Sequence, residues 1–85
     1  MRVTIIPSDD YVSVDGKGFN KLDLSFISAN VHAIQWFDTE GEVEIKDSRG
    51  RITHNQPIDS IAPYQAAIDA WQIAIDEVQP AGSTQ

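Results

Sequence analysis

The first half of the chain changes its hydrophobic pattern every few residues. Short β-branched or alternating runs occupy residues 2–6, 11–14, 17–21, 31–37, 42–46 and 51–54. Alternation with period two places every second side chain on one face, so these runs predict strands. Because turn-forming residues separate them at short intervals, the sequence predicts an antiparallel β-meander of five or six strands.

The turns between these strands have recognisable signatures. Asp15-Gly16 is the dipeptide preferred in type I′ hairpin turns, because both central residues need a positive φ. Residues 7–10 and 38–41 contain proline, aspartate or glycine, and residues 47–50 predict a type I turn with Gly50 in the left-handed region. Residues 22–30 are too irregular for a strand and too short for a stable helix, so we expect a helical turn or 3₁₀ segment over residues 25–29.

From Ser60 onward the hydrophobic period becomes helical. The apolar positions follow the i, i+3, i+4, i+7 rule at Tyr64, Ala67, Ile68, Trp71, Ala74, Ile75 and Val78. Ser60 or Asp59 can cap the helix, Pro63 is tolerated in its first turn, and Pro80 ends it. About 18 residues at 1.5 Å each give roughly 27 Å. The fold prediction is therefore α+β, with one long C-terminal amphipathic helix packed on one face of the sheet.

Length and composition narrow the class of protein. The 85 residues suffice for one domain, which we place at residues 1–79, with residues 80–85 as a flexible C-terminal tail. A formal charge of −7 argues against direct nucleic-acid binding. No apolar run is long enough to cross a membrane, and no signal-peptide pattern is present, so the expected compartment is the cytoplasm.

Metal and catalytic signatures are weak in this sequence. His32 and His54 have no cysteine to join, and neither has another histidine at i+2, i+3 or i+4, so the remaining zinc ligands would have to be scattered carboxylates. Gly16-Lys17-Gly18 lacks the context of a phosphate-binding loop, and no nucleophile motif is present. We expect no metal, no cofactor and no enzymatic activity.

The most informative feature is a row of acids along one predicted hairpin. Residues two apart on a strand share a face, about 6.6 Å apart. The row comprises Asp38, Glu40, Glu42 and Glu44. These carboxylates repel one another unless a cation or a basic partner lies opposite, which predicts a docking strip for a basic protein surface.

Two simpler roles for the acid row also fit the sequence. Lys46, Arg49 and Arg51 on the same hairpin can neutralise part of it. Charges on an edge strand can also serve only to prevent edge-to-edge aggregation.

Two adjacent aromatic residues, Trp36 and Phe37, lie just before the acid row. Alternation along a strand buries only one of them on a one-sided sheet. Trp36 is in phase with Ile34, so we expect Trp36 in the core. Phe37 is then exposed and available as a partner-binding anchor.

Three segments of the chain carry a resemblance to known proteins. They are Ser13-Val14-Asp15-Gly16 through Leu22-Asp23-Leu24-Ser25, then Val31-His32-Ala33-Ile34-Gln35-Trp36, and Glu40-Gly41-Glu42-Val43-Glu44. The pattern resembles small uncharacterised proteins encoded by bacteriophages and prophages, often near tail genes. The resemblance covers roughly Ser13 to Trp71 and contains no catalytic signature.

This resemblance implies a protein-binding role inside an infected cell. The leading hypothesis is a non-enzymatic phage-encoded interaction module, a tail structural or assembly accessory protein, located in the host cytoplasm or incorporated in the virion. The alternative is an acidic anti-defence inhibitor, anti-CRISPR-like, that binds a basic groove of a host nucleic-acid-binding complex. The expected partner is a protein with a basic surface, and homo-oligomerisation is a further option. The predicted partner-binding residues are Phe37, Asp38, Glu40, Glu42 and Glu44.

Overall fold

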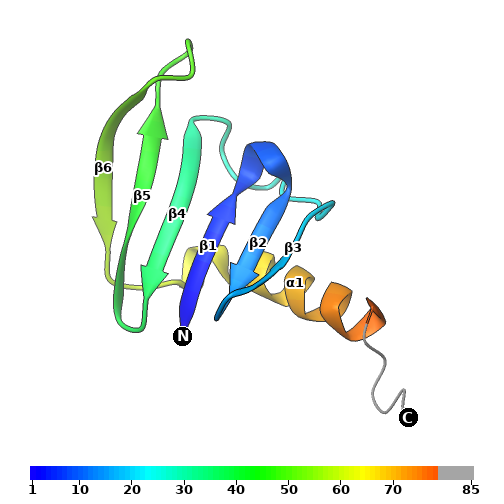
Figure 1. The fold of residues 1–85 in the computed structure, drawn as a ribbon. Coiled ribbons are helices and arrows are strands. Elements are labelled where there is room, and N and C mark those ends of the chain that lie inside the picture. Colours follow the sequence, from blue (N-terminus) through cyan, green and yellow to red (C-terminus); the bar gives the residue numbers. More distant parts are fainter. Residues whose placement is uncertain (79–85) are drawn as a thin grey trace.

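The computed structural model describes residues 1–78, which form one six-stranded antiparallel sheet and one helix (Figure 1). The strands are β1 (Arg2–Ile6), β2 (Tyr11–Val14), β3 (Lys17–Phe19), β4 (Val31–Phe37), β5 (Glu40–Lys46) and β6 (Ile52–Ile58). Short 3₁₀ segments cover η1 (Pro7–Asp9) and η2 (Ala62–Tyr64), and the helix is α1 (Gln65–Val78). The α+β prediction, with six strands and one C-terminal helix, is confirmed. The expected tail, residues 80–85, and the expected helix end at Pro80 lie outside the described residues.

The order of the strands in the sheet is β3-β2-β1-β4-β5-β6. Two three-stranded meanders therefore meet where β1 pairs with β4, with Val3 opposite Trp36 and Ile5 opposite Ile34. The meander is interrupted once, because residues 20–30 carry the chain from β3 at one edge back to β4 in the middle. This return places β6 at the opposite edge of the sheet from β3.

The helix is shorter than the sequence suggested. It has 14 residues, against the expected 18 or so, because Ala62–Tyr64 form a 3₁₀ turn before it. Pro63 lies in that turn, where its missing N–H costs no helical hydrogen bond. The Ser60 hydroxyl oxygen accepts a hydrogen bond from the Ala62 N–H at 3.1 Å, so Ser60 supports the start of the 3₁₀ turn.

The hydrophobic core lies between the helix and one face of the sheet. Alternate strand positions supply fully buried side chains, among them Val3, Ile5, Val12 and Ile34. The return segment adds Leu22, Leu24 and Ile27, and the helix adds Ala67, Ile68 and Trp71. The Trp71 indole N–H also donates to the Lys17 carbonyl oxygen at 2.8 Å, which ties the helix to β3.

Three local predictions need correction. The strand expected over residues 17–21 ends at Phe19, because the chain turns at Lys21, whose φ is 69°. Residues 25–29 contain no continuous 3₁₀ segment but begin in a single hydrogen-bonded turn, in which the Ile27 N–H donates to the Leu24 carbonyl oxygen at 3.0 Å. The strand expected over residues 51–54 extends to Ile58, through a polar stretch and Pro57, because β5 provides a partner along this whole length.

Strand β6 accommodates Pro57 because it is an edge strand. The Lys46 N–H donates to the Asn30 carbonyl at 2.8 Å, so even-numbered residues of β5 point their backbone groups away from β6. Pro57 lies opposite Glu42 and is therefore at a position whose backbone faces solvent. Its missing N–H leaves the β5–β6 ladder intact.

Candidate partner-binding face

The helix packs on one face of the sheet, against β2 and β3, and the opposite face has no covering layer among residues 1–78 (Figure 1). We call this second surface the open face. Register and alternation place on it every second residue of each strand. Its side chains include Arg2, Thr4, Gln35, Phe37 and the acids of β5. The open face is therefore a continuous surface of the sheet that no other segment of residues 1–78 covers.

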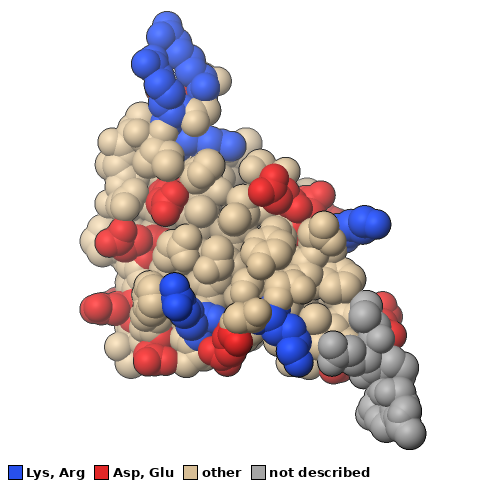
Figure 2. Space-filling view, in the orientation of Figure 1, with Lys and Arg blue, Asp and Glu red and all other residues tan. Residues whose placement is uncertain are grey.

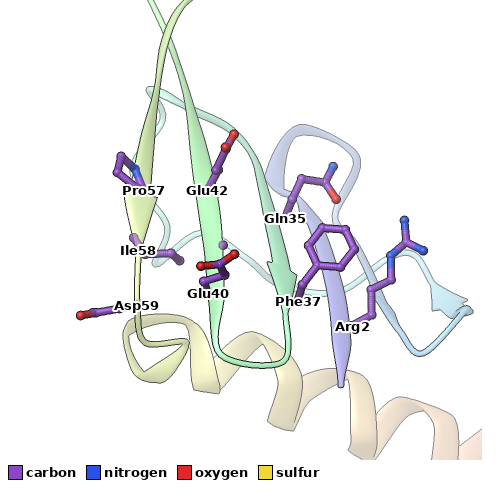
Figure 3. Close-up of a pocket in the computed structure, with 9 residues that line it drawn as sticks. Arg2, Gln35, Phe37, Glu40, Glu42, Pro57, Ile58 and Asp59 are labelled. Atoms are coloured by element: carbon purple, nitrogen blue, oxygen red, sulfur yellow. The ribbon is translucent and has the colours of Figure 1, made fainter.

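A shallow depression of about 950 Å³ lies on the open face, near the turn between β4 and β5 and the end of β6 (Figure 3). It is lined by Arg2, Gln35, Phe37, Glu40, Gly41, Glu42, Pro57, Ile58 and Asp59. Three acids oppose one arginine, so the lining has a net charge of −2. The depression thus combines a negative potential with an aromatic and a proline surface.

Phe37 is the aromatic side chain of this depression. Half of it is exposed (50 %), whereas Trp36 is 4 % exposed and packs in the core. The predicted division between these two neighbours is confirmed. The guanidinium carbon of Arg2 lies 4.8 Å from the centre of the Phe37 ring, a cation–π contact. The ring and the guanidinium group therefore lie side by side in the lining of the depression.

Glu40, Glu42 and Glu44 stand on the open face as the alternation predicted. Glu40 and Glu42 line the depression, whereas Glu44 lies further along β5, opposite Ala33 and Asn55, and outside it. A carboxylate oxygen of Glu42 accepts a hydrogen bond of 2.9 Å from the Asn55 side-chain amide. The remaining acceptor sites of Glu42 can meet donors from a partner.

Asp38 is separated from the other acids by the turn between β4 and β5. Its φ is 51°, and its carboxylate forms an ion pair with the amino group of Met1. The hydrogen bond from that ammonium group, together with its charge, lowers the pKa of the Asp38 carboxyl below its ordinary value. Asp38 does not line the depression, and its contact is with the chain's own amino terminus.

The two simpler roles of the acid row find little support in this fold. Within residues 1–78, none of Lys46, Arg49 and Arg51 forms an ion pair with the glutamates of β5. Arg51 instead lies 3.9 Å from a carboxylate oxygen of Asp47. Strand β5 is also not an edge strand, because it lies between β4 and β6. Among the described residues, the basic residues of this hairpin therefore form no ion pair with the acids of β5.

The sequence pattern did not identify six of the nine residues in the depression: Arg2, Gln35, Gly41, Pro57, Ile58 and Asp59. Gln35 could have been found, since it is in phase with Phe37 on one strand. Arg2 reaches the site through the β1–β4 pairing, and Pro57 and Asp59 reach it through the extension of β6. These pairings join distant parts of the chain, so no local signal revealed them.

The two histidines lie apart from the depression. His32 is at the irregularity in β4 between Val31 and Ala33, and His54 is on β6 opposite Ile45. Among the described residues no group of three or more His, Cys, Asp or Glu is arranged to hold a metal ion. The helix within residues 1–78 is neither long enough nor apolar enough to span a bilayer.

No family model matches the chain, and neither a curated protein nor a solved structure shows significant similarity to it.

Proposed function

We propose that this protein is a non-enzymatic interaction module that binds a basic protein surface through the depression on its open face. The observation that supports the proposal is the combination of a half-exposed Phe37 with the carboxylates of Glu40 and Glu42, which the hairpin's own cations leave unpaired. An aromatic anchor surrounded by polar and charged groups is a common composition of a protein–protein hot spot. The acids select a basic partner and accelerate its approach.

The shape of the depression supports binding in preference to catalysis. It is shallow and open on the sheet surface (Figure 3), and its titratable residues are acids with one arginine. Catalysis of acyl or phosphoryl transfer needs a positioned nucleophile and base, or groups that stabilise developing negative charge. The acids lining this surface would oppose such a charge.

We propose further that the partner belongs to phage tail structure or assembly. The resemblance of the sequence to phage and prophage proteins encoded near tail genes supports this role. Small phage proteins commonly act by binding other proteins, and an open sheet face provides a surface for such binding. The alternative function is inhibition of a host nucleic-acid-binding defence complex, whose basic groove could bind the same acids. The following experiment distinguishes the two functions.

Phe37→Ala is expected to reduce partner recovery at least tenfold, corresponding to about 1.4 kcal/mol of binding free energy. Its free energy of unfolding should change by no more than about 0.5 kcal/mol, because the ring is half exposed. The measurement is affinity capture from phage-infected cells, with captured proteins identified by mass spectrometry. Phe26→Ala is the matched control, since Phe26 has a similar exposure of 52 % in the loop before β4.

Glu40→Gln/Glu42→Gln tests the charge requirement in the same capture. Its matched control is Asp9→Asn/Asp10→Asn, which removes two exposed acids from the connection between β1 and β2. A tail or assembly protein lost with Phe37→Ala and with the Glu variant, but kept with both controls, supports the proposal. A nucleic-acid-binding complex with the same dependence supports the inhibitor instead. Recovery that no variant changes would exclude the depression as the binding surface.

A further inference from the structure

The β5–β6 hairpin carries opposite charges at its two ends. Its tip, residues 46–51, has three basic residues and one acid, a net charge of +2. Its base has the depression, with a net charge of −2. In Figure 2 the Lys and Arg side chains gather over the tip at the top of the view, and Asp and Glu side chains follow the left flank below it. The molecule is therefore strongly dipolar along this hairpin.

The basic tip and the acidic depression of one chain are too far apart to form ion pairs with each other. Lys46 is four residues beyond Glu42 and six beyond Glu40 on β5, separations of about 13 and 20 Å at ~3.3 Å per residue. Both exceed the Debye length of about 10 Å at 0.1 M salt, so screening weakens their attraction within the molecule. The tip of a second molecule can approach these acids more closely than the tip of the same chain.

The tip matches the depression in apolar surface as well as in charge. Ile52 lies directly opposite Lys46 in the register and shares its face, and Ile52 is 50 % exposed. The depression offers Phe37, which is also 50 % exposed. Lys46 has the same strand parity as Glu42 and Glu44, so its side chain projects from the open face. The tip and the depression thus each present one exposed apolar residue beside their charges.

We propose that the open face docks a second copy of this chain, with the tip of each hairpin seated in the depression of the other. This inference rests on the proposed function and names residues 46–52 as the basic surface that the depression binds. Because tip and depression lie on one face, two copies with antiparallel hairpins form both contacts at once. Such an arrangement is closed by a two-fold axis, the commonest symmetry of soluble oligomers.

Paired charge-reversal variants test this docking. Glu40→Lys/Glu42→Lys makes both ends of the hairpin basic, and Arg49→Glu/Arg51→Glu makes both ends acidic. Each variant alone is expected to be monomeric, because like charges then meet at both contacts. An equimolar mixture is expected to restore the dimer, since each tip then finds a depression of opposite charge. Lys17→Glu/Lys21→Glu is the matched control for the arginine variant, with the same change in net charge near the opposite edge of the sheet.

Sedimentation velocity over about a hundredfold range of protein concentration provides the measurement. The wild type and the Lys17→Glu/Lys21→Glu control should approach twice the monomer mass at low salt. Dimerisation should weaken at least tenfold at about 0.5 M NaCl, where surface charges are screened. Far-UV circular dichroism establishes that each variant is folded before its mass is compared.

Three results would overturn the proposal: a wild type that is monomeric at every concentration and low salt, charge-reversal variants that dimerise like the wild type, or a mixture that stays monomeric. The first of these leaves the proposed function standing if capture of a basic partner still depends on Phe37 and Glu42. If the dimer forms but capture of a basic partner does not depend on Phe37 and Glu42, the proposed function is wrong and the self-docking stands.

Discussion

Trp71→Ala is expected to lower the free energy of unfolding by about 3–5 kcal/mol. The indole is 8 % exposed, lies in the middle of α1 and packs in the core. Its removal leaves a cavity and also deprives the Lys17 carbonyl of its hydrogen-bond donor. A domain of this length has a stability of roughly 4–9 kcal/mol, so this loss removes a large fraction of the total stability. Urea denaturation followed by far-UV circular dichroism measures the change.

Trp71→Phe separates the hydrogen bond from the packing. Phenylalanine keeps most of the apolar volume and lacks the N–H group, so a loss of only about 1–2 kcal/mol is expected. The larger effect of alanine then reports the docking of the helix on the sheet. Equal stabilities of Trp71→Ala and wild type would show that α1 does not contribute to the core as described.

Gly41→Ala is expected to destabilise the protein by about 1–3 kcal/mol through overcrowding of the β4–β5 hairpin. A β-carbon at this position would lie 2.3 Å from the Gln35 carbonyl oxygen and 3.0 Å from the Trp36 α-carbon. Both atoms belong to the backbone of the paired strand, so relief requires the two strands to separate. Thermal unfolding should show a lower midpoint without a change in helix content at low temperature.

Gly18→Ala is the control for this substitution. Its β-carbon would meet the Tyr11 hydroxyl oxygen at 2.2 Å, which is the far end of a side chain that can rotate away. Both substitutions restrict the unfolded chain to a similar extent. We therefore expect a smaller loss of stability for Gly18→Ala, and equal losses would contradict backbone crowding as the cause at Gly41.

Local patterns were sufficient to predict most elements of this fold. Strand β4, with Ile34 and Trp36 in phase, and the helix stripe containing Ala67, Ile68 and Trp71 are strongly periodic, and their burial follows directly. The Asp15-Gly16 turn and Gly50, with φ of 81°, also form where the chain's turn signals placed them. These features depend on neighbours within a few residues, which is why one sequence contains enough information for them.

The sheet order and the composition of the depression depend on pairings between distant segments. Nothing near Arg2 indicates that it lies opposite Phe37, because β2, β3 and the return segment lie between β1 and β4 in the sequence. Strand β6 carries Asn55, Gln56 and Pro57, residues of low strand propensity that are retained because β5 pairs with them. Tertiary pairing overrides local strand propensity in β6. For this reason the sequence predicted too few of the residues that line the depression.

Pro57 has a consequence for the behaviour of the protein in concentrated solution. Strand β6 bears no aspartate, glutamate, lysine or arginine between Ile52 and Ile58, and such an edge would ordinarily recruit strands from neighbouring molecules and seed fibrillar aggregates. An outward-facing proline removes one donor from that edge and interrupts its template. Pro57 thereby limits the addition of strands from other molecules to this edge, although β6 has no Asp, Glu, Lys or Arg.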